Sequence, residues 1–216
     1  MFGVFGDEAE EIVALAAELD DDYRLLTHND KLPDELRTLI HHERAAEVVD
    51  SCEPALIPGL LQMESYAGAL FHWAVPLPSD GIDSLIEARM ERQKLLDKSC
   101  CPAFTLFVHE SALHPHMISA RVMNDQRMKL MFAADRDLCT IRIVPIQVGP
   151  TGTLGGPFMV MRHTDYKPIA CVENVSTSAF LEEPTHTDVY QRIVKRLTSL
   201  ALDEGQSKEL ITGLAM

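Results

Sequence analysis

The sequence predicts an α+β fold, with a helical N-terminal half packed on a small, largely antiparallel or mixed sheet and a closing C-terminal helix. Apolar residues recur at helical spacing through the first hundred positions, and after Pro102 the pattern changes to short apolar runs that are typical of strands. Most of these runs follow one another without intervening helices, which argues against a doubly wound parallel sheet. With 216 residues, of which 46% are hydrophobic, the chain can bury a sizeable core.

The sequence predicts four helices before Pro102, each with one apolar face. They span residues 7–26, roughly 33–50, 58–73 and 83–98. Pro33 suits a first helical turn because it lacks the N–H that such a turn leaves unpaired, and Asp83 can cap the fourth helix. We expect Trp73, near the end of the third helix, to face inward.

The second half is predicted to contain five strands, one internal helix and one or two closing helices. The strands are Ala103–His109, Thr140–Ile146, Pro157–His163, Ile169–Glu173 and Thr177–Leu181. The helices are 119–134, Pro184 to about Leu202 and, as a further candidate, Ser207–Leu214. The glycine-rich stretch 149–156 predicts a turn and not a phosphate-binding loop, because no lysine or helix start follows it.

The formal net charge of −14 argues against nucleic-acid binding by this chain. Affinity for a phosphate backbone comes largely from lysine and arginine side chains, and the closest to a basic cluster here is Arg192, Lys195 and Arg196. No run of eighteen apolar residues could span a membrane, and acidic residues occupy the positions that a signal peptide would fill with basic and apolar ones. We therefore expect a cytoplasmic chain with no nucleic-acid or membrane partner.

The histidines and cysteines do not predict a metal site. Three histidines lie close together after a strand: His109, His114 and His116. Pro115 interrupts them, and no predicted element aligns them as tetrahedral ligands. His41, His42 and Glu43 are helical neighbours that face different ways, so we interpret them as a solvated face. The five cysteines show no C-x-x-C spacing and are expected to be reduced thiols, and no common nucleotide-binding or catalytic motif is present, so no cofactor is expected.

Polar side chains on otherwise apolar elements are the candidate site residues. They are Gln62, Tyr66, Arg89, Arg92, Glu110 and Glu173. The glutamine and the tyrosine are expected on one helical face at i, i+4, and the two arginines on another. In one interpretation Glu110 or Glu173 pairs with an arginine to pin helices onto the sheet, because buried charge is normally paired. In the other, these groups border a pocket between the sheet and the 58–73 and 83–98 helices, lined mainly by Met, Phe and Leu.

Six short motifs resemble, in order, those of the DUF5753 family. Residues 53–62 (EPALIPGLLQ) with Tyr66-Ala67 resemble its signature, and residues 89–93 (RMERQ) resemble its R-x-x-R-Q helix. The other four are HESAL at 109–113, IRIVP at 141–145, GPF at 156–158 and CVE at 171–173. The resemblance covers roughly residues 35–215, and His109 departs from it because the family tends to carry Asp there.

The resemblance implies the C-terminal domain of actinobacterial XRE-type helix-turn-helix regulators, also described as antitoxin-like. Such a domain normally follows a DNA-binding module of some seventy residues, whereas about 35 residues precede the matching region here. We therefore expect residues 1–34 to be a helical arm or the remnant of a lost helix-turn-helix, and residues 35–216 to be the regulatory, ligand-binding domain.

Two hypotheses for the function follow. In the first, the chain is a non-enzymatic regulator that does not bind DNA and binds a small-molecule effector, a small partner protein or a second copy of itself. Its ligand would contact Gln62, Tyr66, Arg89, Glu110 and Glu173. In the second, a lone family member serves as a biosynthetic enzyme, in which His109, Glu110 or His163 transfers a proton or directs a cyclisation in an apolar pocket.

Overall fold

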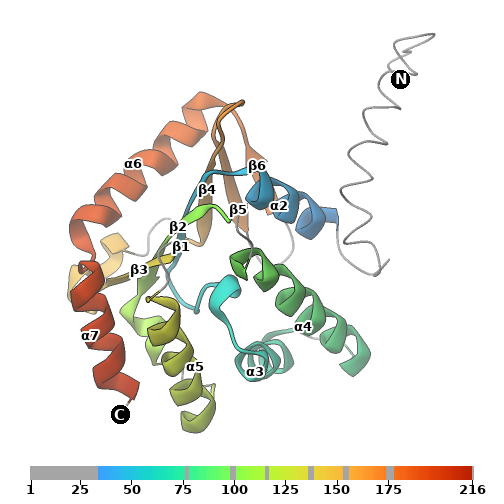
Figure 1. Ribbon diagram of the computed structural model, residues 1–216, viewed down its shortest axis with the longest axis vertical. Coiled ribbons are helices and arrows are strands. Elements are labelled where there is room, and N and C mark those ends of the chain that lie inside the picture. The colour runs from blue at the N-terminus through green and yellow to red at the C-terminus, as the bar shows by residue number, and fades with distance from the viewer. Residues whose placement is uncertain are drawn as a thin grey trace. The chain divides into compact units, whose positions relative to one another are not determined.

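The computed structural model describes residues 34–75, 78–97, 101–114, 117–135, 139–152, 156–173 and 178–215 (Figure 1). The helix predicted over 7–26 lies outside these residues, as do Pro115 and His116.

Six strands form one mixed sheet, which confirms the α+β prediction. They are β1 (Val48–Glu53), β2 (Ala103–His109), β3 (Cys139–Val144), β4 (Phe158–Arg162), β5 (Ile169–Glu173) and β6 (Ser178–Leu181). The strand order is β3-β2-β1-β4-β5-β6. Strands β1, β2 and β3 run parallel, whereas β4, β5 and β6 pair antiparallel, and the two halves meet where β1 pairs with β4. The strands predicted after Pro102 are therefore present, with ends that agree or differ by at most two residues.

The helices of the described chain are α2 (Asp34–Ala45), α3 (Glu64–Ala74), α4 (Ser79–Gln93), α5 (Ala120–Ala133), α6 (Pro184–Leu200) and α7 (Glu204–Ala215). Short 3₁₀ turns occur at Gly59–Leu61 (η1), Lys94–Asp97 (η2), Glu110–Leu113 (η3) and Ile146–Gly152 (η4). None of these helices is both long and apolar enough to cross a membrane.

The larger hydrophobic core lies on one face of the sheet. There Val49 of β1 and Leu106 of β2 pack with Tyr66 of α3, Leu130 of α5 and Ile211 of α7. Each of these five side chains is at most 1% exposed, so this face is sealed by helices over most of its length.

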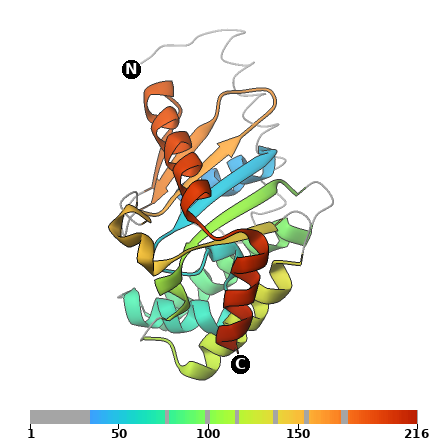
Figure 2. The ribbon, with the colours of Figure 1, turned by 90° about the vertical axis from the view of Figure 1, so that its left-hand side faces the viewer.

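The opposite face of the sheet carries a smaller core under α6. Cys52, Phe107 and Val160 of the sheet pack with Val194 and Leu197 of the helix. Figure 2 faces the side on which α6 lies over the strands. Residues of β1 therefore alternate between two cores, with Val49, Ser51 and Glu53 on the face of the larger one.

The prediction of one helix over 33–50 is wrong at its C-terminal end. Helix α2 ends at Ala45, and Val48–Glu53 forms the central strand β1. This strand is hydrogen-bonded on both sides, parallel to β2 and antiparallel to β4. The short apolar run is compatible with a helix or a strand when only its own residues are considered. It forms a strand because it pairs with segments far along the chain.

The third and fourth helices also differ from the prediction. Pro58 precedes the single turn η1, Gln62 is extended with ψ 140°, and α3 begins at Glu64. Gln62 and Tyr66 therefore do not share a helical face. Trp73 is 68% exposed instead of facing inward. Helix α4 begins at Ser79, four residues before the predicted cap at Asp83.

Candidate functional site

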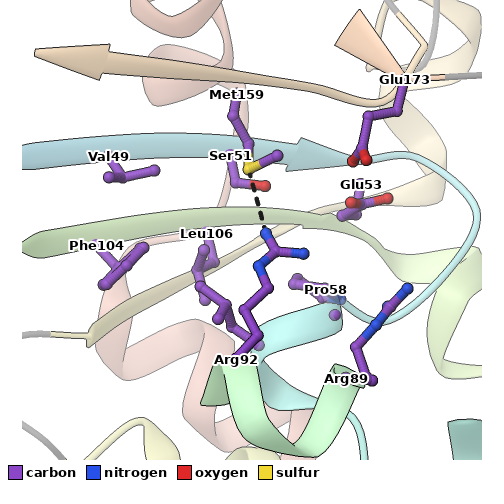
Figure 3. Close-up of a pocket in the computed structure, with 12 residues that line it drawn as sticks. Val49, Ser51, Glu53, Pro58, Arg89, Arg92, Phe104, Leu106, Met159 and Glu173 are labelled. Carbon is purple, nitrogen blue, oxygen red and sulfur yellow. Dashed lines mark hydrogen bonds between the residues drawn. The ribbon is translucent and has the colours of Figure 1, made fainter. Parts of the chain in front are cut away.

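A small pocket lies between the sheet and the η1–α4 region, where the sequence predicts one (Figure 3). Its volume is about 40 Å³. The lining residues are Val49, Ser51, Glu53, Pro58, Gly59, Leu60, Arg89, Arg92, Phe104, Leu106, Met159 and Glu173. The predicted Met, Phe and Leu side chains are present, but the polar groups are more numerous and more highly charged than expected.

The pocket is apolar at one end, the floor, and charged at the other end, the mouth, about 13 Å further along β1 (Figure 3). Val49, Phe104 and Leu106 at the floor are each 1% exposed or less. They come from alternate positions of β1 and β2 and so point to the same side of the sheet. Glu53 and Glu173, which end β1 and β5, are half-buried. The charged groups therefore lie where the pocket meets solvent.

Arg92 pairs with Glu43 of α2, inside the protein. Its Nε and Nη2 donate to the two carboxylate oxygens of Glu43 at 2.8 and 2.6 Å, and Nη2 lies 3.8 Å from Sδ of Met159. Burial lowers the pKa of Arg92, but the charge and hydrogen bonds of Glu43 outweigh it and raise that pKa. Glu43 is 0% exposed, so interpreting it as part of a solvated face was wrong.

Arg92 is therefore paired, but its partner is Glu43 of α2 and neither of the glutamates that the sequence suggested. A two-bond arginine–carboxylate contact fixes the geometry of both side chains. It joins α4 to α2, and through Met159 it reaches β4. Because both carboxylate oxygens of Glu43 accept from Arg92, the positive charge of Arg92 is largely neutralised and acts only weakly on the groups at the pocket mouth.

Arg89, one turn earlier on α4, points toward the mouth. Its Nη1 donates to Oε1 of Gln62 at 3.1 Å, and its guanidinium lies 5.3 Å from the ring centre of Phe71. Burial first, and then the charge of Arg92, lower the pKa of Arg89 to about 10. A Cβ at residue 59 would lie 2.4 Å from Nη1 of Arg89, so a glycine is needed there for this approach.

Glu53 and Glu173 extend from the same face of the sheet, and their carboxylates point toward one another (Figure 3). Burial, and then the negative charge of Glu173, raise the pKa of Glu53 to about 7, although Arg89 and Arg92 oppose the shift. Among the described residues, no hydrogen bond or ion pair within 4.0 Å joins either carboxylate to a cation. Near neutral pH the mouth can therefore take up or release a proton.

A polar network holds the η1 turn that forms one wall of the pocket. Gln126 Nε2 donates to the carbonyl of Leu61 at 2.7 Å, and its Oε1 accepts from the N–H of Met63 at 2.7 Å. Gln93 Nε2 donates to the carbonyls of Gly59 and Gln62 at 2.9 and 2.6 Å. Together with Lys129 Nζ, which donates to the carbonyl of Gln62 at 2.9 Å, these side chains bond the backbone groups at the break between η1 and α3.

Gln62 and Tyr66 hold the chain before η1 instead of lining the pocket. Nε2 of Gln62 donates to the carbonyl of Ile57 at 2.8 Å, and the N–H of Ile57 donates to Oη of Tyr66 at 3.4 Å. Both side chains are at most 1% exposed. They therefore position the P-G-L-L-Q turn, and Gln62 also orients Arg89.

Glu110 and His109 lie outside this pocket. A Glu110 carboxylate oxygen accepts from the N–H of Ile146 at 2.8 Å, which joins η3 to the start of η4. Nδ1 of His109 lies 2.7 Å from Oγ of Ser111 and accepts from its N–H, so the imidazole caps η3. Burial lowers the pKa of His109.

His163 lies at the other end of the strands. Its Nε2 is 3.2 Å from the carbonyl of His42, and its ring stacks on Tyr166 with centroids 4.0 Å apart. Because Val48 pairs with Arg162 while Glu53 pairs with Val108, the length of β1 separates His163 from His109, about 16 Å at 3.3 Å per residue. The structure therefore separates His163 from His109 and Glu110, and none of these three residues lines the pocket.

Sequence reasoning identified Arg89, Arg92 and Glu173, but not Glu53 or Ser51. Glu53 is the first residue of the E-P-A-L-I-P-G-L-L-Q motif, and this membership was the one signal that could have identified it. Its role depends on β1 being a strand, because period-2 alternation is what turns Ser51 and Glu53 toward the pocket. In the described parts of the chain, no group of three or more His, Cys, Asp or Glu side chains could hold a metal ion.

The geometry permits several kinds of chemistry. The two carboxylates can accept hydrogen bonds or a positive charge, Arg89 can donate, and Glu53 titrates near neutrality. No curated protein and no solved structure matches the chain. Residues 36–213 match the sequence model described as "Domain of unknown function (DUF5753)", so the chain belongs to the DUF5753 family.

Proposed function

We propose that this chain is a non-enzymatic regulatory domain that binds a small-molecule effector in the pocket between β1 and α4. The observation that carries the proposal is a cavity with two carboxylates without a close cation at its mouth and apolar side chains at its other end. Apolar walls with a few converging polar groups are typical of ligand sites, and because this cavity of about 40 Å³ is much smaller than the roughly 300–1,000 Å³ that hold drug-sized ligands, it suits only a very small molecule.

The pocket also suits regulation because its walls come from distant segments. Glu53 is on β1, Arg89 on α4 and Glu173 on β5, and η1 lies between them. A ligand that contacts several walls binds one arrangement of α4 on the sheet more tightly than others, and it shifts the population toward that arrangement. A role in transcriptional control, exerted through a partner and not through DNA, is part of the same proposal and rests on the family resemblance.

The test is thermal denaturation with a panel of amines, alcohols and carboxylic acids of only a few heavy atoms at millimolar concentration, because the cavity of about 40 Å³ admits nothing larger. A true effector raises the melting temperature because it binds the native state. Ser51→Leu places a larger side chain in the cavity and should abolish the shift, whereas Ser65→Leu, at an exposed position of α3, should not. If no compound raises the melting temperature, or if hits act equally on Ser51→Leu, the proposal fails.

One observation favours an enzyme as the second candidate. A half-buried glutamate with a pKa of about 7 is suited to act as a general base, because catalytic groups work best near the operating pH. That role would belong to Glu53 and not to His109, Glu110 or His163. Mass spectrometry of each hit after incubation decides between the two, since an effector is recovered unchanged and a substrate is consumed by wild type but not by Glu53→Gln.

A further inference from the structure

Three histidine side chains gather where the last turn of α2 meets the sheet. Measured between ring centres, His42 lies 5.6 Å from His41 and 6.2 Å from His163, which directly follows β4. The ring of His42 also lies 5.5 Å from that of Phe180 on β6, the strand beside α2 in Figure 1. These four residues, the His42 cluster, therefore join α2 to the end of β4 and to β6.

The hydrogen bonds of the His42 cluster suit neutral imidazole rings. Nε2 of His163 lies 3.2 Å from the carbonyl oxygen of His42, and because a carbonyl only accepts, this nitrogen carries the proton. Nδ1 of His42 is buried and has no hydrogen-bond partner among the described residues. A protonated imidazole carries an N–H at both nitrogens, so a charged His42 would bury an N–H without an acceptor. The neutral ring with its proton on Nε2 avoids burying that N–H.

The surroundings of the rings also oppose positive charge. Burial first, and then the charges of His41 and His163, lower the pKa of His42, while Glu182 after β6 opposes the shift. Burial also lowers the pKa of His163, although hydrogen bonding to the backbone of His42 and Lys167 favours its charged form. His41 adds to the lowering at both rings, because like charges repel.

Other titratable side chains belong to the same segments. They are Arg37 and Arg44 of α2, Glu47 after it, Arg162, Asp165, Tyr166 and Lys167 around the β4–β5 turn, and Glu183 after β6. Several of these side chains have partners of their own: Arg162 pairs with Asp50, Thr164 donates to Glu47, and Tyr166 stacks on His163. Among the described residues, Glu182 is the acid whose charge favours a protonated His42, and burial together with the two histidines outweighs it.

Helix α2 is also attached to the domain by contacts that do not involve histidine. Leu39, about one turn before His42, is buried in the larger core. Glu43, the next residue after His42, holds Arg92 of the pocket wall through two hydrogen bonds. A change at the His42 cluster is therefore transmitted directly to the residue that neutralises Arg92.

We propose that the His42 cluster is an acid-sensitive latch, in which uptake of protons by His42 and His163 frees the last turn of α2 from the β4–β5 turn and from β6. The latched form requires neutral rings, whereas in the freed form both rings reach water and take up protons. Freeing this turn also loosens Glu43 from Arg92, so the latch connects pH with the wall of the pocket. The latch needs no ligand, so it stands whether or not an effector binds.

Linkage gives the direction and the size of the effect. A histidine whose pKa is lower in the latched form binds more protons when freed, so the latch is strongest above the ordinary pKa of 6.5 and weakens as the pH falls below it. Between pH 7 and pH 5 the freed form gains at most about 25-fold for each histidine, the limit for a latched ring that takes up no proton. Because Leu39 and the pair of Glu43 with Arg92 oppose opening, the freed form becomes more frequent without becoming dominant.

The experiment is hydrogen–deuterium exchange of the full chain at pH 7 and pH 5, followed by mass spectrometry of peptides and corrected for the intrinsic exchange rates. Amide exchange reports such rare opening events. We expect the protection of the last two turns of α2 to fall by roughly threefold or more at pH 5, within the limit set by linkage. Helix α5 is the reference, because a change in global stability alters the protection of both helices. A fall in α2 should therefore exceed any fall in α5.

Two variants and one control identify the histidines as the cause. His42→Phe keeps an aromatic ring against Phe180 but cannot titrate, and His163→Gln keeps a side-chain N–H that can reach the carbonyl of His42. Each should remove a large part of the additional exchange of α2 at pH 5, and the double variant should remove nearly all of it. His186→Gln, at an exposed position of α6, should behave as wild type.

Three results would overturn the latch: equal protection of α2 at the two pH values in wild type, an equal fall in α2 and α5, or an unchanged fall in the double variant. Nuclear magnetic resonance titration of the histidine rings in the wild-type chain tests the same idea without a substitution. His42 and His163 should titrate at lower pH than the exposed His186, and titration of all three at the same pH would also overturn it.

Discussion

At the scale of single residues, burial separates two arginines that look alike in the sequence. Arg92 is 8% exposed and meets a fully buried carboxylate in a bidentate contact, so it acts in stability. Arg89 has one side-chain acceptor, the amide of Gln62, and lies at the pocket mouth. Two residues that share a helical face thus serve different purposes, because Glu43 is within reach of one and not of the other.

Removing Glu43 should strongly destabilise the protein. Glu43→Leu leaves the guanidinium of Arg92 buried without its partner, which costs roughly 3–5 kcal/mol in the free energy of unfolding. Urea denaturation measures the loss. The exposed pair Glu91–Lys94 of α4 is the control, and Glu91→Gln should cost less than about 1 kcal/mol.

The double variant Glu43→Leu/Arg92→Met identifies the cause. It removes both charges together, so most of the lost stability should return, and the two substitutions should be strongly non-additive. Additive losses would show that packing and not charge pairing dominates at this contact.

Glu53 should make stability fall as pH rises from about 4.5 to about 7. Its pKa is about 7 in the folded chain and about 4.5 when unfolded, so in this range the folded state holds more protons than the unfolded state. The stabilising contribution is complete below pH 4.5 and lost above pH 7. Glu53→Gln should therefore raise the melting temperature at pH 8 and change it little near pH 4.5. The opposite pattern would mean that Glu53 is ionised and favourably paired in the folded protein.

The site was partly predictable from sequence for reasons that these residues illustrate. Arg89, Arg92 and Glu173 stand out because they are charged residues on apolar elements. Glu43 does not, since its neighbours His41 and His42 suggest a polar surface, and the partner that buries it is 49 residues away. A contact between residues so far apart in the sequence cannot be predicted from the spacing of neighbouring residues.

At the scale of elements, the break between η1 and α3 determines the shape of the pocket. Had the helix run unbroken from Pro58, as the sequence suggests, Gly59 would not lie against Arg89. Instead one 3₁₀ turn closes, Gln62 extends, and α3 starts afresh at Glu64. Gln126 of α5 forms hydrogen bonds with the carbonyl of Leu61 and the N–H of Met63 at this break. The helix propensities of residues 58–66 do not predict this contact, because Gln126 is distant in the sequence.

Gly59→Ala should displace Arg89 without unfolding the protein. The new methyl group would overlap Nη1, and the flexible end of the arginine can move, at the cost of its bond to Gln62. We expect a loss of about 1 kcal/mol, which is the typical net value of one hydrogen bond. A cycle with Arg89→Met tests the mechanism: in the Arg89→Met background, Gly59→Ala should cost clearly less. An equal cost in both backgrounds would indicate backbone strain at residue 59 instead.

Element types were easier to predict than element order in the sheet. The strands after Pro102 are bounded by glycine, proline and changes of period, and they were found with small errors. Strand β1 was missed because Val48–Glu53 follows a helix closely and its β character comes from its two neighbours in the sheet. Without β1, the parallel pairing of β1, β2 and β3 could not be anticipated.

At the scale of the whole molecule, the negative net charge disfavours binding to negatively charged partners. Of 33 acidic and 19 basic residues, the basic ones nearest to forming a cluster are Arg192, Lys195 and Arg196 on α6. All three are exposed, yet they lie in a chain with a net charge of −14. Long-range repulsion therefore opposes a phosphate backbone even where a local attraction exists.

The chain alone should not bind duplex DNA at physiological salt. Electrophoretic mobility shift and footprinting assays with the full chain should show no specific complex, because few phosphate contacts are available to offset the repulsion. Weak binding at low salt that Arg192→Glu/Lys195→Glu abolishes would be non-specific and consistent with this expectation. A nanomolar, sequence-dependent complex at physiological salt would contradict it.

The central position of β1 also governs how the chain reaches its fold during synthesis. Strand β1 leaves the ribosome early, but its antiparallel partner follows much later, as the 112 residues between the ion-paired Asp50 and Arg162 show. At about 5–20 residues per second, β1 waits roughly 6–22 s with an edge unpaired. Nascent chains with such an open edge are targets for chaperones and for aggregation. The yield of folded protein should thus depend on translation speed over residues 54–157, the stretch between β1 and β4.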